Sequence, residues 1–113
     1  MNRVKNKAAL ITGGASGLGL ASGKLLLEEG AKVIFTDINR EELEKIKDQI
    51  DNKFVNCYST KLLDVTNEEN WKNVLSESTN ELGGLNILLN SAGITFGADI
   101  VSTSLEVWKK VHD

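Results

Sequence analysis

The stretch A-A-L-I-T-G-G-A-S-G-L-G, residues 8–19, decides the fold of this chain. Its first four residues, Ala8 to Ile11, are apolar and predict a short buried strand. The run then breaks into a glycine-rich turn, after which Leu18 to Glu29 predict a helix. A turn that leads from a strand into a helix can hold an anion, because the first N–H groups of the helix lack backbone partners and its dipole is positive there.

The glycines of this turn have separate physical reasons to be glycine. Gly13 can adopt the positive φ that a sharp exit from the strand requires. Gly17 and Gly19 lack a Cβ atom, which lets a pyrophosphate and the strand come close to the helix. A tight loop that binds nothing explains the same glycines, so the turn by itself leaves both interpretations open.

A second buried strand is predicted from Ala31 to Thr36, after the helix-stop residue Gly30, and it ends at Asp37. Asp37 follows Gly19 by 18 residues, close to the spacing of about 20 at which an acidic residue receives the ribose hydroxyls in a dinucleotide fold. An ionised carboxylate only accepts hydrogen bonds, which suits a ribose diol. The alternatives are a solvated strand end or a cap for the next helix. Asn39 already matches that cap, with Glu42 as its capping-box partner.

Two further helices are predicted from the spacing of apolar residues. In the first, Leu43, Ile46 and Ile50 mark the side that faces the core. Its opposite side is charged and predicted to face solvent, with Arg40, Glu41, Glu44, Lys45 and Lys47. The second helix is predicted to begin at Thr66, whose spacing to Glu69 matches a capping box. Its predicted core face consists of Trp71, Val74, Leu75, Ser78 and Leu82.

Strands and helices alternate along the chain without a linker or a repeat. Gly83-Gly84 ends the second of these helices, and Leu85 to Leu89 predict a fourth strand. The boundary of the third strand, between Asn52 and Leu63, stays open. The alternation predicts a parallel sheet with right-handed crossovers and a ligand site beyond the carboxyl ends of its strands. The residues at those ends are Gly13, Asp37, Asp64 and Asn90.

Four motifs in chain order resemble those of the short-chain dehydrogenase/reductase family. Thr12 to Gly19 resembles its T-G-x-x-x-G-x-G loop, and Asp37 occupies its ribose position. Asp64-Val65 is similar to its adenine-contacting D-V pair. Asn90-Ser91-Ala92-Gly93 resembles its N-N-A-G stretch, with Ser91 in place of the second Asn. The resemblance covers the chain from about Lys7 to Asp113.

This resemblance implies an α/β fold of the Rossmann type: a doubly wound parallel sheet of about four strands in the order 3-2-1-4, with flanking helices. It also implies NAD as the cofactor. The complete family member transfers hydride between NAD and a secondary alcohol or ketone, and the loop with its T-D-I-N continuation looks nearest to hydroxysteroid-type members. The implied cofactor-binding residues are Gly13, Ser16, Gly17, Leu18, Gly19, Asp37, Ile38, Asp64, Val65, Asn90, Ala92 and Gly93.

The family's catalytic residues have no counterparts in this sequence. The family's Asn is expected two residues beyond Asp113, and its Ser and Y-x-x-x-K pair are also missing. Tyr58, the sole tyrosine, is followed four residues later by Leu62 where the family has Lys. We therefore expect residues 1–113 to form a single, incomplete NAD-binding domain that is inactive alone. The alternative is a truncated non-catalytic module that binds a nucleotide or a partner chain.

Composition narrows the partners. The chain has 113 residues, of which 41% are hydrophobic, which suffices for the core of one domain. A net charge of −3 without a basic block argues against nucleic acid or an anionic membrane as a partner. With one cysteine, Cys57, and one histidine, His112, neither a disulfide framework nor a zinc set is expected. Met1 to Lys7 is basic, but the apolar run that follows, Ala8 to Ile11, is too short for a signal peptide. A cytoplasmic location is therefore expected.

Self-association is also expected. Without a fifth strand beside it, the apolar fourth strand, Leu85 to Leu89, would form an exposed edge of the sheet. Leu105, Trp108 and Val111 on a predicted final helix, residues 105–113, would add an apolar patch. Pairing between copies would cover both surfaces, which predicts a homo-oligomer. A small alcohol or ketone is expected as a partner only where the missing half is present.

Overall fold

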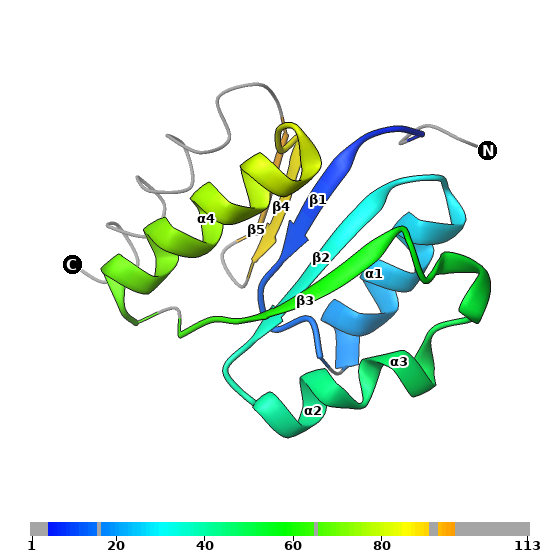
Figure 1. Cartoon of the computed structure of the whole chain (residues 1–113), viewed down its shortest axis with the longest axis horizontal. Coiled ribbons are helices and arrows are strands. Elements are labelled where there is room, and N and C mark those ends of the chain that lie inside the picture. The colour runs from blue at the N-terminus through cyan, green and yellow to red at the C-terminus, as the bar shows by residue number, and fades with distance from the viewer. Residues whose placement is uncertain (1–4, 16, 65, 91–92, 97–113) are drawn as a thin grey trace.

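The computed structural model describes residues 5–15, 17–64, 66–90 and 93–96. Among them, the strands form one sheet in the order β3-β2-β1-β4-β5 (Figure 1). The strands are β1 (Ala8–Ile11), β2 (Lys32–Asp37), β3 (Tyr58–Leu62), β4 (Ile87–Asn90) and β5 (Gly93–Phe96). Strands β1 to β4 are parallel, whereas β5 runs antiparallel to β4. The predicted parallel order 3-2-1-4 is confirmed.

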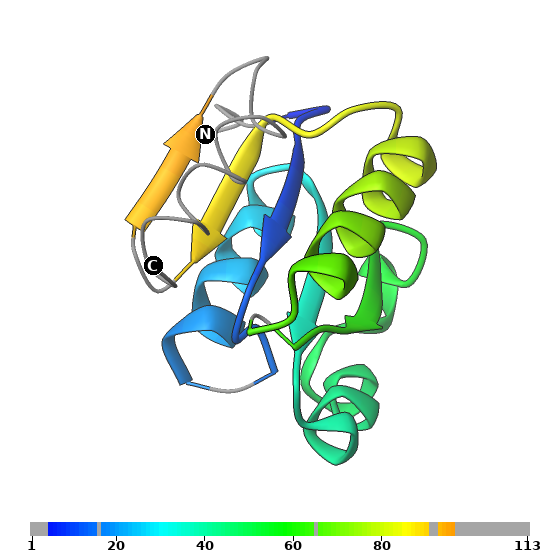
Figure 2. The ribbon, with the colours of Figure 1, turned by 90° about the vertical axis from the view of Figure 1, so that its left-hand side faces the viewer.

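Helices cover both faces of this sheet. They are α1 (Gly17–Glu28), α2 (Arg40–Glu44), α3 (Ile46–Gln49) and α4 (Glu68–Leu82), with a short 3₁₀ helix, η1 (Asn52–Phe54), before β3. Figure 2 shows α1 on one side of the sheet and α4 on the other. This is the doubly wound arrangement that the alternation of strands and helices predicted.

The alternation of side chains along each strand divides the core in two. Ala9, Ile11, Val33 and Phe35 pack with the apolar residues of α1, α2 and α3. The intervening residues, among them Leu10 and Ile34, pack with α4. Because both faces are covered, β1 is apolar along its whole length and β2 is apolar from Val33 to Phe35, as is typical of parallel strands.

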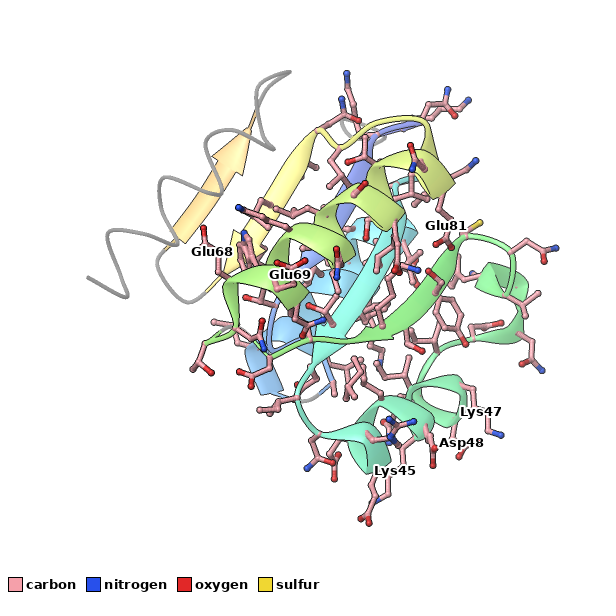
Figure 3. All side chains as sticks on the ribbon, turned by 60° about the vertical axis from the view of Figure 1, so that its left-hand side comes forward. Lys45, Lys47, Asp48, Glu68, Glu69 and Glu81 are labelled. Atoms are coloured by element: carbon pink, nitrogen blue, oxygen red, sulfur yellow. The ribbon has the colours of Figure 1, made fainter. Side chains whose placement is uncertain are left out.

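The predicted faces of the helices are confirmed. Leu43, Ile46 and Ile50 are buried, and so are the α4 residues Trp71, Val74, Leu75 and Ser78, with Leu82 partly buried beside them. The charged side of α2 and α3 is exposed. Figure 3 shows Lys45 and Asp48 on the outer side of these helices. Gly83 ends α4 in the left-handed conformation, with φ of 74°.

One predicted helix start is confirmed and one is wrong. The Asn39 side chain caps α2 by accepting a hydrogen bond from the Glu42 N–H. The α4 cap is Asn67 instead of Thr66, and it accepts from the Asn70 N–H. The N–H and the hydroxyl of Thr66 instead donate to Asp64 Oδ1, at 2.9 and 2.6 Å.

Strand β5 corrects the prediction of an exposed edge at the fourth strand. It pairs with β4 so that Leu88 lies opposite Thr95 and Asn90 lies opposite Gly93. The β4 backbone groups are therefore hydrogen-bonded on both sides, to β1 and to β5. The predicted apolar patch of residues 105–113 lies outside the described residues. No helix in the described part of the chain is long and apolar enough to cross a membrane.

The open boundary of the third strand is resolved by η1. Asp51 caps this short helix by accepting a hydrogen bond from the Lys53 N–H. Phe54 then packs against the core, and β3 begins at Tyr58. The segment before β3 therefore holds a helical turn of its own.

Candidate functional site

The glycine loop, residues 12–19, lies at the carboxyl end of the sheet, where backbone hydrogen bonds join it to two strands. The Thr12 N–H donates to the Leu89 carbonyl of β4 at 2.9 Å. The Gly14 N–H donates to the Thr36 carbonyl of β2 at 2.8 Å. In Figure 2 the loop lies at the lower ends of β1 and β4, just before α1. The loop is thus at the switch point between the first and fourth strands, where doubly wound folds bind ligands.

Two glycines of the loop have backbone angles that favour glycine. Gly13 has φ of 63° and Gly17 has φ of 56°. No heavy atom lies within 4 Å of the position that a Cβ would take at either residue. The space beside both residues is therefore open, which leaves room for a ligand next to the start of α1.

Gly19 and Gly23 have a different reason to be glycine. A Cβ at Gly19 would overlap the Gly13 carbonyl oxygen, so this glycine lets α1 approach the loop as predicted. A Cβ at Gly23 would overlap the ring of Phe35 on β2. Our sequence analysis missed Gly23, although a glycine in the middle of a predicted helix is itself a signal of close packing. Together these two contacts set the position of the α1 N-terminus relative to the strands.

Asp37 connects β2 to the glycine loop. Its Oδ2 accepts a hydrogen bond from the Ala15 N–H at 3.2 Å, and its Oδ1 accepts from the Asn39 N–H at 3.0 Å. Asp37 is half-buried, and each of its oxygens keeps further acceptor capacity. The predicted ribose position is therefore beside the loop. The carboxylate also supports the start of α2 through its bond to the N–H of Asn39, the residue that caps this helix.

Thr36 is a buried polar residue next to Asp37 that sequence reasoning missed. Its hydroxyl donates to the Ile11 carbonyl at 2.7 Å, and its side chain is fully buried. This bond joins Ile11, the last residue of β1, to the residue of β2 that precedes Asp37. A threonine at the end of an otherwise apolar strand was the available signal, since a buried hydroxyl needs a partner.

Asp64 lies just beyond β3 and is bound within its own turn. Its Oδ1 accepts from the Thr66 N–H and hydroxyl, while its N–H donates to Asn70 Oδ1 at 2.7 Å. The preceding residue, Leu63, donates its N–H to the Asp37 carbonyl at 2.9 Å. The turn after β3 is therefore tied to the end of β2, on the same edge of the sheet as the glycine loop.

Some of the remaining predicted site residues lie within the described part of the chain and others do not. Leu18 and Ile38 lie at this edge with side chains that are 83% and 66% exposed. Asn90 ends β4 and pairs with Gly93 of β5. Ser16, Val65 and Ala92 lie outside the described residues. The structure thus brings Gly13, Gly17, Gly19 and Asp37 together, with the ends of β3 and β4 on the same edge of the sheet.

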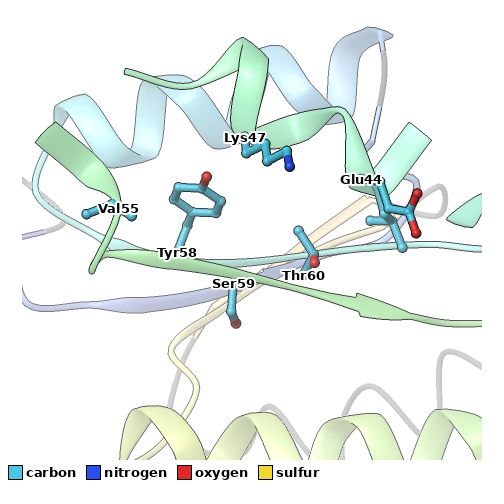
Figure 4. A pocket seen from close by; sticks show the side chains of 7 residues that line it. Glu44, Lys47, Val55, Tyr58, Ser59 and Thr60 are labelled. Atoms are coloured by element: carbon cyan, nitrogen blue, oxygen red, sulfur yellow. The ribbon is translucent and has the colours of Figure 1, made fainter. Parts of the chain in front are cut away.

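A separate groove of about 580 Å³ lies between α2, α3 and β3. Figure 4 shows the Tyr58 hydroxyl and the Lys47 ammonium on the groove side of the chain, with Ser59 pointing away from it. The Tyr58 ring also meets Phe35 edge to face at 6.0 Å. None of the residues that line this groove belongs to the glycine loop. In the described residues, no group of three or more His, Cys, Asp or Glu side chains could hold a metal ion.

Comparisons with known proteins agree with this geometry. The chain is 40% identical over 115 residues to a 2,5-dichloro-2,5-cyclohexadiene-1,4-diol dehydrogenase of Sphingobium indicum, covering 97% of this chain and 44% of that protein. It is 39% identical over 110 residues to a 3-beta-hydroxysteroid dehydrogenase of Comamonas testosteroni, covering 97% of this chain and 42% of that protein.

Among solved structures, an NAD⁺-bound xylitol dehydrogenase superposes with a TM-score of 0.65 at 27% identity, covering 76% of this chain and 33% of that one. The chain thus spans less than half the length of the curated relatives described above. Residues 7–113 match the short chain dehydrogenase family. With the glycine loop, Asp37 and the parallel sheet in their expected places, the chain belongs to the short-chain dehydrogenase family of oxidoreductases.

Proposed function

We propose that this chain binds NAD at the glycine loop and forms the cofactor-binding part of an oxidoreductase. The observation that carries the proposal is the hydrogen bond between Asp37 Oδ2 and the Ala15 N–H. It places a carboxylate that can accept ribose hydroxyls directly beside the turn that leads into α1. Adenosine and pyrophosphate, which are adjacent in the cofactor, would thus meet adjacent groups of the protein.

The loop fits a pyrophosphate in both space and charge. The Cβ positions of Gly13 and Gly17 are open, and α1 has 12 residues with no acidic side chain in its first turn. The first N–H groups of a helix lack backbone partners and lie at the positive end of the helix dipole. The N–H groups from Gly17 onward would therefore donate to the phosphates without a competing carboxylate in that turn.

The exposed apolar side chains at this edge fit the rest of the cofactor. Ile38 directly follows Asp37 and is 66% exposed, so it would cover one face of the adenine when the ribose meets Asp37. Leu18, at the start of α1, is 83% exposed and would contact the cofactor next to the loop. Asp64, which follows β3, and Asn90, which ends β4, would contact the same ligand, and so would Val65, Ala92 and Gly93.

The proposed cofactor is NAD and not NADP. Asp37 would face the 2′-phosphate of NADP with the same sign of charge, a juxtaposition that costs on the order of 1–3 kcal/mol, or about tenfold to a hundredfold in affinity. Arg40 is exposed and lies three residues further along the chain, so it is the cation that could offset this repulsion.

Titration with NADH and with NADPH, monitored by fluorescence, tests the choice of cofactor. We expect NADH to bind tighter by the factor given above. The Arg40→Ala variant serves as a control and should leave NADH affinity unchanged. Equal or tighter binding of NADPH would refute the assignment.

In the complete protein, we propose, hydride passes between NAD and a secondary alcohol or ketone. The names of the two relatives, a cyclohexadiene-diol dehydrogenase and a hydroxysteroid dehydrogenase, support this substrate class. The 113 residues contain no Tyr-x-x-x-Lys sequence, so the proton transfer would depend on residues outside them. A second candidate function is a non-catalytic nucleotide-binding module, and an assay for turnover by the complete protein separates the two.

Assembly and location also stay proposals. With β4 paired on both sides, the exposed parallel edge in the described sheet is β3, and we propose that copies of the chain associate as a homo-oligomer. Light scattering during size exclusion tests this, and a monodisperse monomer would contradict it.

A cytoplasmic location stays a prediction, which fractionation of cells that express a tagged chain would check.

A further inference from the structure

We infer that Asp37 positions the glycine loop before any ligand binds, in addition to accepting the ribose hydroxyls. This inference rests on the proposed function for its effect on the ligand. Its structural part depends on two hydrogen bonds between the Asp37 carboxylate and backbone N–H groups that lie 22 and 2 residues away along the chain. In this role Asp37 acts on the phosphates through the loop and is a positioning residue.

The geometry gives each carboxylate oxygen a separate task. Oδ2 receives the Ala15 N–H at 3.2 Å, and Oδ1 receives the Asn39 N–H at 3.0 Å. Asn39 in turn caps α2 through its bond to the Glu42 N–H. The Asp37 side chain therefore links the glycine loop to the start of α2, across the end of the sheet.

The link divides the N–H groups of the loop into two sets. The Gly14 N–H is bound to the Thr36 carbonyl at 2.8 Å, and the next N–H, that of Ala15, is bound to Asp37. Both are directed toward the end of β2. Among the described residues, the N–H groups that follow Ala15 are those from Gly17 into the first turn of α1, and we assign these to the pyrophosphate. Asp37 thereby helps to determine which backbone groups face the ligand.

Ala15 makes this support necessary. Ala15 is only 3% exposed, so water has little access to its N–H. A buried donor that loses its acceptor carries the full cost of desolvation, and the loop would rearrange to find another partner. An Asn at position 37 has one acceptor oxygen, and its NH₂ group would face one of the two N–H groups that a carboxylate satisfies.

The inference makes a prediction that the ribose role alone does not. A ligand without ribose hydroxyls makes no hydrogen bond with Asp37. If Asp37 only bound the ribose hydroxyls, replacing it would therefore not weaken the binding of such a ligand. Replacing the carboxylate also removes a negative charge near the phosphates, which by itself would tighten binding of an anion. Weaker binding of such a ligand can therefore be attributed to the loop.

The experiment compares ADP with 2′,3′-dideoxy-ADP on the 113-residue chain by isothermal titration calorimetry. In the Asp37→Asn variant we expect dideoxy-ADP to bind about 3- to 10-fold more weakly, which corresponds to the loss of one hydrogen bond within the loop. We expect the affinity for ADP to fall further, because ADP also loses its ribose contact with the carboxylate. Asp51→Asn is the control, because it makes the same charge change at the cap of η1, and it should leave both affinities unchanged. Unchanged or tighter binding of dideoxy-ADP to Asp37→Asn would overturn the inference.

Amide hydrogen exchange of the ligand-free chain tests the loop without any ligand. In Asp37→Asn we expect exchange at Ala15 to be about 3- to 10-fold faster, while exchange at Gly14, whose acceptor is a backbone carbonyl, stays the same. Equal rates at Ala15 in both proteins would refute the positioning role. If the wild-type chain bound neither nucleotide, the proposed function would fail, and the exchange rates would still decide whether Asp37 positions the loop.

Discussion

Replacing Gly17 by alanine separates the need for ligand space from the need for a particular backbone angle. Gly17 has φ of 56°, and nothing lies within 4 Å of an added Cβ. A methyl group there meets no protein atom, so the cost to the fold is that of the left-handed conformation, about 1–2 kcal/mol. For a domain of this size we expect the melting temperature to fall by roughly 4–15 °C.

The effect on the ligand is expected to be larger. The added methyl would occupy the space assigned to a phosphate, displacing it from N–H donors at the start of α1. A hydrogen bond to a charged group contributes about 1.5–3 kcal/mol, so losing one weakens NADH binding by roughly 10- to 150-fold. Fluorescence titration with NADH at a temperature well below the melting transition measures this loss on folded protein.

Gly83→Ala is a matched control because Gly83 has φ of 74° and also has no atom within 4 Å of an added Cβ. It lies at the end of α4, so it should cause a similar loss of stability and leave NADH affinity unchanged. If Gly17→Ala and Gly83→Ala bound NADH equally well, the assignment of the phosphate site to the glycine loop would be wrong.

Three further outcomes are expected. Gly23→Ala should destabilise the chain by about 1–3 kcal/mol in urea unfolding, since its methyl group would overlap the Phe35 ring, and unchanged stability would contradict the packing of α1 on β2. Lys61, 3.0 Å from Glu81, holds the pKa of that carboxyl below its usual 4.5. The pair therefore stabilises the fold above about pH 4.5 and loses this effect as the pH falls through the lowered pKa, so the melting temperatures of wild type and Glu81→Gln should converge in acid. Finally, the 113-residue chain with NAD and a panel of secondary alcohols should produce no NADH absorbance, because it lacks the Tyr-x-x-x-Lys proton donor; clear turnover would refute this.

The sequence by itself determined the features that depend on local chemistry. The apolar run before Gly13, the positive φ of the turn and the helix that follows could be read from residue types at short spacing. The same holds for the cap at Asn39 and the end of α4 at Gly83. Each follows from backbone sterics or from hydrogen bonds within a few residues, which is why a linear pattern suffices.

The tertiary structure decided the features that depend on contacts between distant segments. Asp37 was predicted at the end of β2, but only the fold shows that its carboxylate reaches Ala15, because the bond spans 22 residues. The need for glycine at position 23 comes from Phe35 on a neighbouring strand. Thr66 matched a capping pattern, yet its donors bind Asp64, and α4 begins at Glu68 with Asn67 as its cap.

Strand β5 shows the same limit at the level of the sheet. It follows β4 after two residues. In the sequence analysis its first residue, Gly93, was assigned only to a binding motif, and its other residues were not predicted to form a strand. Whether such a segment turns back and pairs depends on what else competes for the β4 edge, which a strand pattern does not encode. Local propensity therefore specified the strands, the turns and the identity of the loop, whereas pairing and side-chain reach, which depend on segments far apart in the chain, were decided by the folded molecule alone.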